Sequence, residues 1–234
     1  MKKLLKPLLI LFTAIILSSC ACMQNPDTCD NDPLFIAWSG SYNRHAESSD
    51  YTQPNEDAGI LKSAKSTTAG SGSDRSGVPG IRAGIGYKVP LSPNFNLETG
   101  AFYAMKGSKL SDTNFEDQIK LSYIDIPLLA KYTFTESPFS IYGGLQPSVL
   151  LSGKQKLDFN GTKTTVDLKE NLNKLDLAAS LGVGYAFDNG FGIDLAYDLG
   201  LKNIYKDNYG GYELKNRSIR LGVRYTFKNK KQSN

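Results

Sequence analysis

Eight stretches of the sequence alternate apolar and polar residues with a period of two. Such alternation is the pattern of a β-strand with one apolar and one polar face. Most stretches exceed the usual strand length of about five or six residues and match the roughly nine to eleven that cross a bilayer at a tilt. They are Leu34 to Asn43, Val78 to Val89, Phe95 to Met105, Lys120 to Phe134, Phe139 to Leu151, Lys174 to Phe187, Phe191 to Lys202 and Leu214 to Phe227. We therefore expect an all-β protein.

The connections between these stretches are alternately short and long. The short ones read PLSPN, TESP and DNG, and the long polar ones are Arg44 to Gly77, Lys106 to Ile119, Ser152 to Asn173 and Asn203 to Glu213. Short turns at one rim and long loops at the other are typical of outer-membrane barrels. The sequence predicts an eight-stranded antiparallel up-and-down transmembrane β-barrel over residues 34–227, in the bacterial outer membrane. Both ends of the chain, including a tail at 228–234, should be periplasmic.

The last stretch indicates which face of the strands meets lipid and which face lines the lumen. In RSIRLGVRYTF, residues 217–227, Leu221 and its alternate neighbours are apolar, whereas Arg220 and Arg224 lie on the other face. In a membrane barrel the apolar face meets lipid and the charged face lines the lumen. By this parity the lumen receives Arg82, Lys88, Glu98, Lys106, Asp125, Lys131, Asp176, Asp194, Asp198, Lys202, Arg220 and Arg224. Because side chains fill an eight-stranded interior, we expect a neutralised charge network that plugs the barrel.

Aromatic residues cluster beside the short turns on the apolar face. They are Tyr87, Phe95, Tyr132, Phe134, Phe139, Tyr185, Phe187, Phe191, Tyr225 and Phe227. Such a cluster is typical of an aromatic girdle at a membrane interface. Tyr42, Tyr103, Tyr205 and Tyr212 lie near the opposite strand ends and are candidates for a second girdle.

The N-terminus has the pattern of a secretory signal. Three lysines precede an apolar run from Leu8 to Leu17 that is short for a membrane span, so residues 1–19 are expected to be removed. The sequence LSSC ending at Cys20 resembles a lipobox, which predicts lipidation of Cys20. Ordinary cleavage after Ala21 is the alternative. Residues 20–33 would then form a periplasmic tether, in which Cys22 and Cys29 remain as a pair that can close a small disulfide loop.

Composition excludes several functions. The chain has 27 basic and 23 acidic residues, and three of the bases lie in the signal, so the mature chain has 24 bases against 23 acids. This balance gives no reason to expect nucleic-acid binding. Three cysteines and one histidine offer too few ligands for a zinc site. We expect neither a metal nor another cofactor.

One histidine limits the enzymatic hypotheses. Some small outer-membrane barrels modify lipid A with a Ser-His pair. Such a site here would need His45, expected in a loop just beyond the first strand, with Ser39 or Ser41 as nucleophile and Glu47 as orienting group. No recognisable motif surrounds these serines, and a solvated loop histidine explains His45 equally well. We therefore expect no enzymatic activity.

Two neighbouring segments carry a family resemblance. The sequence LSYIDIPLLAKYTF followed by FSIYGGLQPSVLLSGK resembles the PorT-like outer-membrane β-barrel family, which is common in Bacteroidetes. LDLAASLGVGYAFDNGFGIDLAYDLGLKNI is similar to that family's next hairpin, so the resemblance covers about residues 78–227. It implies a barrel in the outer membrane and carries over no catalytic residues.

These observations favour a structural, surface-interaction or adhesion role. Expected partners are outer-membrane lipid, lipopolysaccharide and a protein that contacts the outer loops or the tether. The alternative is an accessory subunit of an outer-membrane secretion or uptake complex, which would use the tether. A lipid A-modifying enzyme that uses His45 is the third hypothesis.

Overall fold

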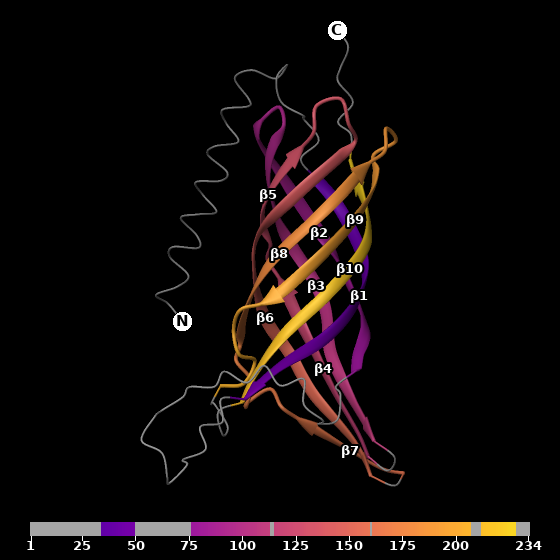
Figure 1. Ribbon diagram of the computed structural model, residues 1–234, viewed down its shortest axis with the longest axis vertical. Coiled ribbons are helices and arrows are strands. Elements are labelled where there is room, and N and C mark those ends of the chain that lie inside the picture. The colour runs from indigo at the N-terminus through magenta and orange to yellow at the C-terminus, as the bar shows by residue number, and fades with distance from the viewer. Residues whose placement is uncertain (1–33, 50–75, 113–114, 160, 207–211, 228–234) are drawn as a thin grey trace, which may run out of the picture.

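The computed structural model describes residues 34–49, 76–112, 115–159, 161–206 and 212–227. The strands are β1 (Leu34–Ser49), β2 (Ser76–Ser92), β3 (Phe95–Asp112), β4 (Phe115–Asp125), β5 (Leu128–Thr133), β6 (Phe139–Phe159), β7 (Thr162–Asp167), β8 (Leu175–Ala186), β9 (Phe191–Gly200) and β10 (Tyr212–Thr226). Figure 1 shows them wound around a common axis. The predicted all-β fold is therefore confirmed.

The sheet closes on itself as a barrel. All ten strands belong to one sheet with the order β2-β1-β10-β9-β8-β6-β4-β3-β5, and the additional β2–β3 and β6–β5 pairings complete the ring. β4 and β5 occupy one position in the ring, and β7 lies outside it because β6 is the one described strand with which it pairs. Eight antiparallel positions remain, as the sequence predicts. The first and last strands close the ring through a long register from Phe35↔Thr226 to Ser49↔Tyr212.

The stretch predicted as one strand, residues 120–134, is interrupted. β4 ends at Asp125 and β5 begins at Leu128, with Ile126 and Pro127 between them. Pro127 has no backbone N–H to donate to the ladder. The Ile126 amide instead donates to the Pro147 carbonyl of β6 at 2.8 Å, which holds the two halves in line.

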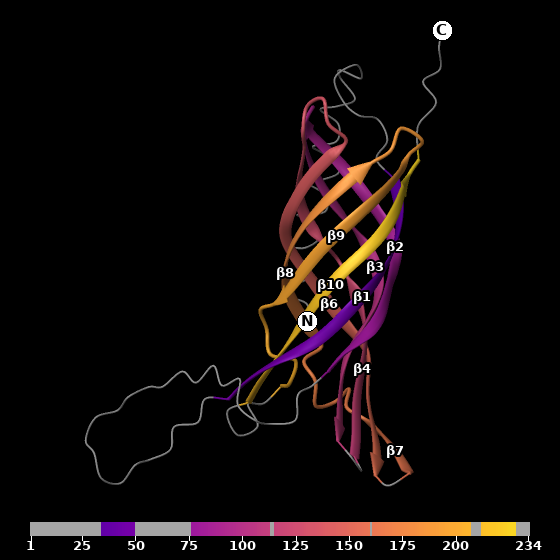
Figure 2. The same ribbon diagram turned by 45° about the vertical axis from the view of Figure 1, so that its right-hand side comes forward.

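Two of the predicted long loops are largely strand. β3 and β4 continue to the pair Asp112↔Phe115, so residues 106–119 form the end of a hairpin. β6 runs to Phe159 and β7 pairs with it from Phe159↔Thr162 to Lys154↔Asp167, within residues 152–173. The prediction of loops here was wrong because polar residues occupy both faces of strands that extend past the apolar belt. Figure 2 shows these extensions at one end of the barrel, which we call the extended end; the short turns define the turn end.

The barrel has an apolar outside and a polar inside. Leu181 and Leu221 on the outer face are 67% and 61% exposed, whereas Asp125 and Ser180 on the inner face are 1% and 0% exposed. Close packing of the interior depends on glycine in places, because a Cβ on Gly182 would overlap the Tyr142 ring. No helix among the described residues is long and apolar enough to cross a membrane.

Candidate functional site in the barrel interior

One ion pair joins three adjacent strands in the middle of the interior. Arg220 of β10 donates from Nε and Nη2 to the two carboxylate oxygens of Asp198 on β9, at 2.6 and 2.9 Å. Ser180 of β8 donates to the same carboxylate at 2.6 Å, and Ser218 donates to it at 3.0 Å. Two parallel N–H···O bonds are the strongest arrangement available to a guanidinium and a carboxylate. Asp198 therefore has its hydrogen-bonding capacity met without water.

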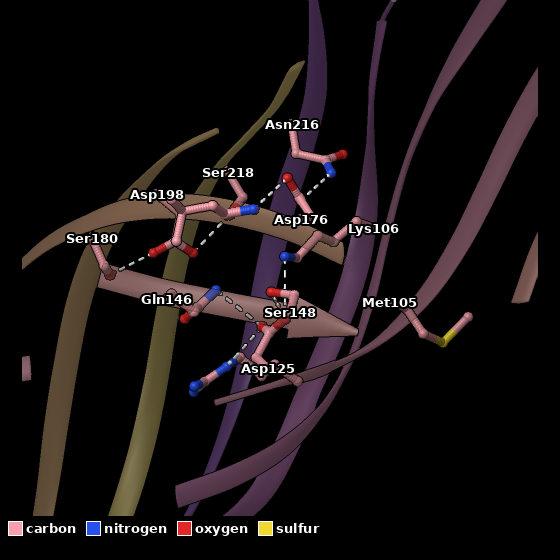
Figure 3. Close-up of polar contacts among 12 residues, drawn as sticks. Met105, Lys106, Asp125, Gln146, Ser148, Asp176, Ser180, Asp198, Asn216 and Ser218 are labelled. Carbon is pink, nitrogen blue, oxygen red and sulfur yellow. Dashed lines mark hydrogen bonds and ion pairs between the residues drawn. The ribbon is translucent and has the colours of Figure 1, made fainter. Parts of the chain in front are cut away.

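Asp125 forms the centre of a second group across the interior. Ser148 Oγ and Gln146 Nε2 donate to its carboxylate at 2.7 and 3.1 Å, both from β6. Lys106 of β3 and Arg82 of β2 form ion pairs with it at 3.2 and 3.4 Å. Figure 3 shows Lys106, Gln146 and Ser148 converging on Asp125 below the Asp198 group. Four strands are thus linked through one buried carboxylate.

A third group lies nearer the turn end. Arg224 donates to both oxygens of Glu98 at 2.7 and 3.1 Å and to both oxygens of Asp194 at 2.6 and 3.1 Å. Lys131 forms an ion pair with Glu98 at 3.2 Å. The Arg224 guanidinium also lies 4.7 Å from the centre of the Phe35 ring. Two cations and two carboxylates therefore compensate one another across the barrel.

Two further polar pairs lie in the interior toward the extended end. Asn216 donates to Asp176 at 2.7 Å, so this carboxylate is held by an amide rather than by a base. Ser108 Oγ and His45 Nδ1 lie 2.7 Å apart, and the two residues are 0% and 2% exposed.

An apolar cap covers the extended end of the interior. It consists of Ile119, Leu121, Tyr123, Leu150, Leu168, Leu172, Ile204 and Leu214, with Tyr205 packed against them. Backbone bonds tie its segments together: Asn173 N donates to Ile204 O at 2.7 Å, and Ile204 N donates to Leu214 O at 2.9 Å. The Asn173 side chain donates to the carbonyls of Asn203 and Tyr205 at 2.9 and 2.7 Å. The cap thus joins the segments before β8 and after β9 to β4, β6 and β10.

One small cavity lies within the described part of the interior. A cavity of about 40 Å³ lies between the Asp198 and Glu98 groups and is lined in part by Arg82, Tyr142, Arg220 and Arg224. This volume admits a few water molecules rather than a solute.

Most of the predicted lumen charges lie in these groups. Arg82, Glu98, Lys106, Asp125, Lys131, Asp176, Asp194, Asp198, Arg220 and Arg224 are named above, and Lys88 is half-buried opposite Glu98 in the β2–β3 register. Lys202 is the exception, because β9 ends at Gly200 and Lys202 is exposed beyond it. Alternation along the strands predicted these charged residues of the lumen. The sequence analysis did not predict their uncharged hydrogen-bond partners, which are Ser148, Gln146, Ser180, Ser218 and Asn216. These partners could have been found from the sequence, because they are polar residues at inward positions of the same strands.

The prediction of His45 as a loop residue was wrong. His45 lies within β1, which continues to Ser49, and its side chain is buried in the interior. Ser41 and Ser39 share its inward parity, but along an extended strand they stand about 13 and 20 Å away, at roughly 3.4 Å per residue. Neither can reach His45 as a nucleophile. The side chain of Glu47 lies outside the described residues.

The aromatic residues beside the turns lie on the outer face of the barrel. Several form a chain of ring contacts, with Phe139–Tyr185 and Tyr185–Phe187 centroids 4.9 Å apart and Phe191–Tyr225 centroids 5.0 Å apart. At the other end Tyr42 and Tyr103 are 55% and 40% exposed on the outer face. Tyr205 was wrongly placed in this second girdle, because it packs against the cap. The side chain of Tyr212 lies outside the described residues.

The predictions about the two chain ends also lie outside the described residues. They concern the signal at 1–19, the tether at 20–33 with Cys20, Cys22 and Cys29, and the tail at 228–234. Among the described residues, no group of three His, Cys, Asp or Glu side chains is arranged to hold a metal ion.

A closed antiparallel ring with an apolar outer face and a polar inner face is the architecture of a transmembrane β-barrel protein. Residues 47–206 match the model of the outer membrane protein beta-barrel domain, and the chain belongs to this family. The protein is accordingly located in the outer membrane. No similar curated protein is found.

Several solved structures are similar to this chain. Neisserial surface protein A is 14% identical with a TM-score of 0.46, and the match covers 83% of this chain and 97% of that one. The attachment invasion locus protein Ail of Yersinia pestis is 16% identical with a TM-score of 0.44, covering 84% and 99%. OprG from Pseudomonas aeruginosa is 14% identical with a TM-score of 0.40, covering 84% and 97%.

Proposed function

We propose that this protein is a non-conducting barrel of the outer membrane that acts through surfaces beyond the membrane. The observation that carries the proposal is the combination of a compensated interior with an apolar cap. Glu98, Asp125, Asp194 and Asp198 each contact at least one base, and the cap residues close over the interior at the extended end. Opening a path for ions would require separating buried ion pairs and wetting the cap. The described residues offer no alternative contacts that would compensate for the loss of these ion pairs or of the cap packing.

The extended end supplies the interaction surface in this proposal. β3, β4, β6 and β7 continue as one sheet past the apolar belt, and all six residues of β7 are exposed. Among the described strands β7 pairs with β6 alone, and an unpaired edge is a template for another strand. Thr162, Thr164, Thr165 and Val166 favour extended structure. An extended segment of a surface protein is the kind of partner that such an edge accepts.

Conductance tests the closed barrel. The purified full chain in a planar bilayer is expected to give no steady current at neutral pH. A stable pore would contradict the proposal and favour transport, with Arg82, Arg220 and Arg224 as candidates for an anion path.

A shortened hairpin tests the surface role. Replacing residues 157–164 by Asn-Gly joins the paired residues Lys156 and Thr165 with a two-residue turn and removes most of β7. Cells that display the full chain should adhere to cultured host cells more than cells that display the shortened variant. The control is a lengthened DNG turn at the other end. Equal adherence of the wild type and the shortened variant would contradict the surface role.

The narrower family assignment is also a proposal. We infer that the chain belongs to the PorT-like branch because the residues of the motif that carries the resemblance have defined structural roles in the barrel. Asp125 of the IDIPLL motif is the centre of an interior polar group, and Pro127 marks the break between β4 and β5. The accessory-subunit alternative would use the tether at 20–33. Co-purification of the full chain with a secretion complex, lost when residues 21–33 are deleted, would favour that alternative.

A further inference from the structure

Basic side chains gather on the outer face of the barrel at the extended end. On β4 and β6, Lys120 stands directly opposite Lys154 in the antiparallel register, and Lys156 follows on the same face. All three are exposed. On β1 and β10, Arg44 stands directly opposite Arg217. At the turn end, by contrast, no described Lys or Arg projects from the outer face.

Like charges placed opposite each other destabilise an antiparallel pair. Lys120, Lys154 and Lys156, which we call the β4/β6 basic patch, form no ion pair with any carboxylate among the described residues. Asp167 of β7 is opposite Lys154 on the other side, but these two residues are not within ion-pair distance. On the neighbouring strand β3, by comparison, Lys109 pairs with Glu116 at 2.8 Å. The patch is therefore arranged for an anion from outside the chain.

The position of the patch identifies the kind of anion. Ile124, Val149 and Leu151 precede it on the outer faces of β4 and β6, and Leu151 is 41% exposed. The bases therefore begin where the apolar belt ends. A ligand that covers both regions must carry acyl chains next to a negatively charged headgroup. Free phosphate would use only the bases.

Neighbouring side chains complete a phosphate site. Gln118 of β4 and Thr165 of β7 flank Lys156 in register, one on each side. Both carry hydrogen-bond donors suited to phosphate oxygens, and the lysines supply the charge.

We propose that the β4/β6 basic patch binds the phosphate of a phosphorylated glycolipid of the lipopolysaccharide type in the outer leaflet. The acyl chains lie along Ile124, Val149 and Leu151, and the sugar phosphate contacts Lys120, Lys154 and Lys156. The site rests on the orientation of the extended end toward the cell exterior. Its binding test measures neither adhesion through the β7 edge nor conductance, so failure of this proposal and failure of the proposed function are distinguishable.

The test compares two triple variants of the full chain in detergent micelles. One carries Lys120→Gln, Lys154→Gln and Lys156→Gln; the matched control carries Lys202→Gln, Lys206→Gln and Arg217→Gln, which are exposed bases outside β4, β6 and β7. Binding of a bisphosphorylated lipid A is measured for both by native mass spectrometry and by titration. We expect the patch variant to lose at least ten-fold in affinity and the control to match the wild type. Equal binding by the two variants would overturn the proposal.

Two further binding measurements identify the ligand. The dephosphorylated glycolipid should bind the wild type as weakly as the phosphorylated form binds the patch variant. Inorganic phosphate at the same concentration should not compete; full competition would show a free-phosphate site and overturn the glycolipid assignment.

Circular dichroism checks that the variants fold. If the triple variant does not fold, Lys154→Gln alone should weaken binding and leave thermal stability equal or higher, because it removes the repulsion with Lys120.

Discussion

Arg224 and Glu98 lie 126 residues apart in the sequence and form a two-pronged ion pair in the barrel interior, with N–O distances of 2.7 and 3.1 Å. The same guanidinium contacts Asp194 of the neighbouring strand. One side chain thus connects β10 to β9 beside it and to β3 on the other side of the lumen.

Arg224→Ala should destabilise the barrel by about 3–5 kcal/mol, because it removes the guanidinium that donates to the buried Glu98 carboxylate and to the half-buried Asp194 carboxylate. Urea unfolding in lipid vesicles measures the loss. Arg217→Ala, on the exposed face of the same strand, is the control and should change the free energy of unfolding by less than about 0.5 kcal/mol. A loss of similar size in both variants would contradict the compensating role of Arg224.

Arg220→Leu should destabilise the barrel, because it leaves the buried Asp198 carboxylate without the guanidinium that pairs with it. Adding Asp198→Leu removes the stranded charge, and apolar replacement of a whole buried pair is often neutral or stabilising. The double variant should therefore be more stable than Arg220→Leu alone. Thermal unfolding in detergent measures the order. Strictly additive losses would show that the two side chains do not act as a pair.

Leu221→Arg, one residue further along β10, should impair membrane insertion by roughly 2–4 kcal/mol near the bilayer midplane. Leu221 is 61% exposed on the outer face, so an arginine there would meet lipid. The fraction inserted into vesicles is the measurement, and Leu201→Arg, beyond the end of β9, is the control. Normal insertion of Leu221→Arg would mean that the outer face is not the lipid face.

Orientation follows from labelling of intact cells. A membrane-impermeant maleimide should label Thr164→Cys in β7 at the extended end and spare Asn189→Cys in the DNG turn. The unsubstituted chain, with its three native cysteines, sets the background. The opposite labelling pattern would invert the barrel in the membrane, and would also remove the basis for the glycolipid site.

Ser108 should not act as a nucleophile although it contacts His45. Its side chain is fully buried, so a substrate carbonyl has no access to its Oγ. A fluorophosphonate probe should therefore leave the folded protein unlabelled. Labelling that disappears in Ser108→Ala would revive the enzymatic hypothesis with a nucleophile other than Ser39 or Ser41.

The ring of strands was predictable because a membrane imposes alternation on every residue between its two surfaces. The same alternation placed Arg220 and Asp198 on the inner face. It could not reveal that they pair, since pairing depends on the stagger between β9 and β10. Beyond the membrane the constraint ends: Lys109 and Glu116 face water on paired strands, and their polarity was mistaken for that of a loop.

The cap could not be predicted for a related reason. Leu168, Leu172 and Ile204 are isolated apolar residues within polar stretches, and only the closed barrel brings them to Ile119 and Leu214. His45 was misplaced because β1 continues past Asn43 without a change in composition that would mark its end.

The composition of the cap sets an order of events during assembly. Leu214 of the cap belongs to β10, which also closes the ring against β1. Until this final strand arrives, the mouth at the extended end lacks part of its cover and water can reach the interior charges. Exclusion of water from the interior charges is therefore coupled to closure of the ring by β10.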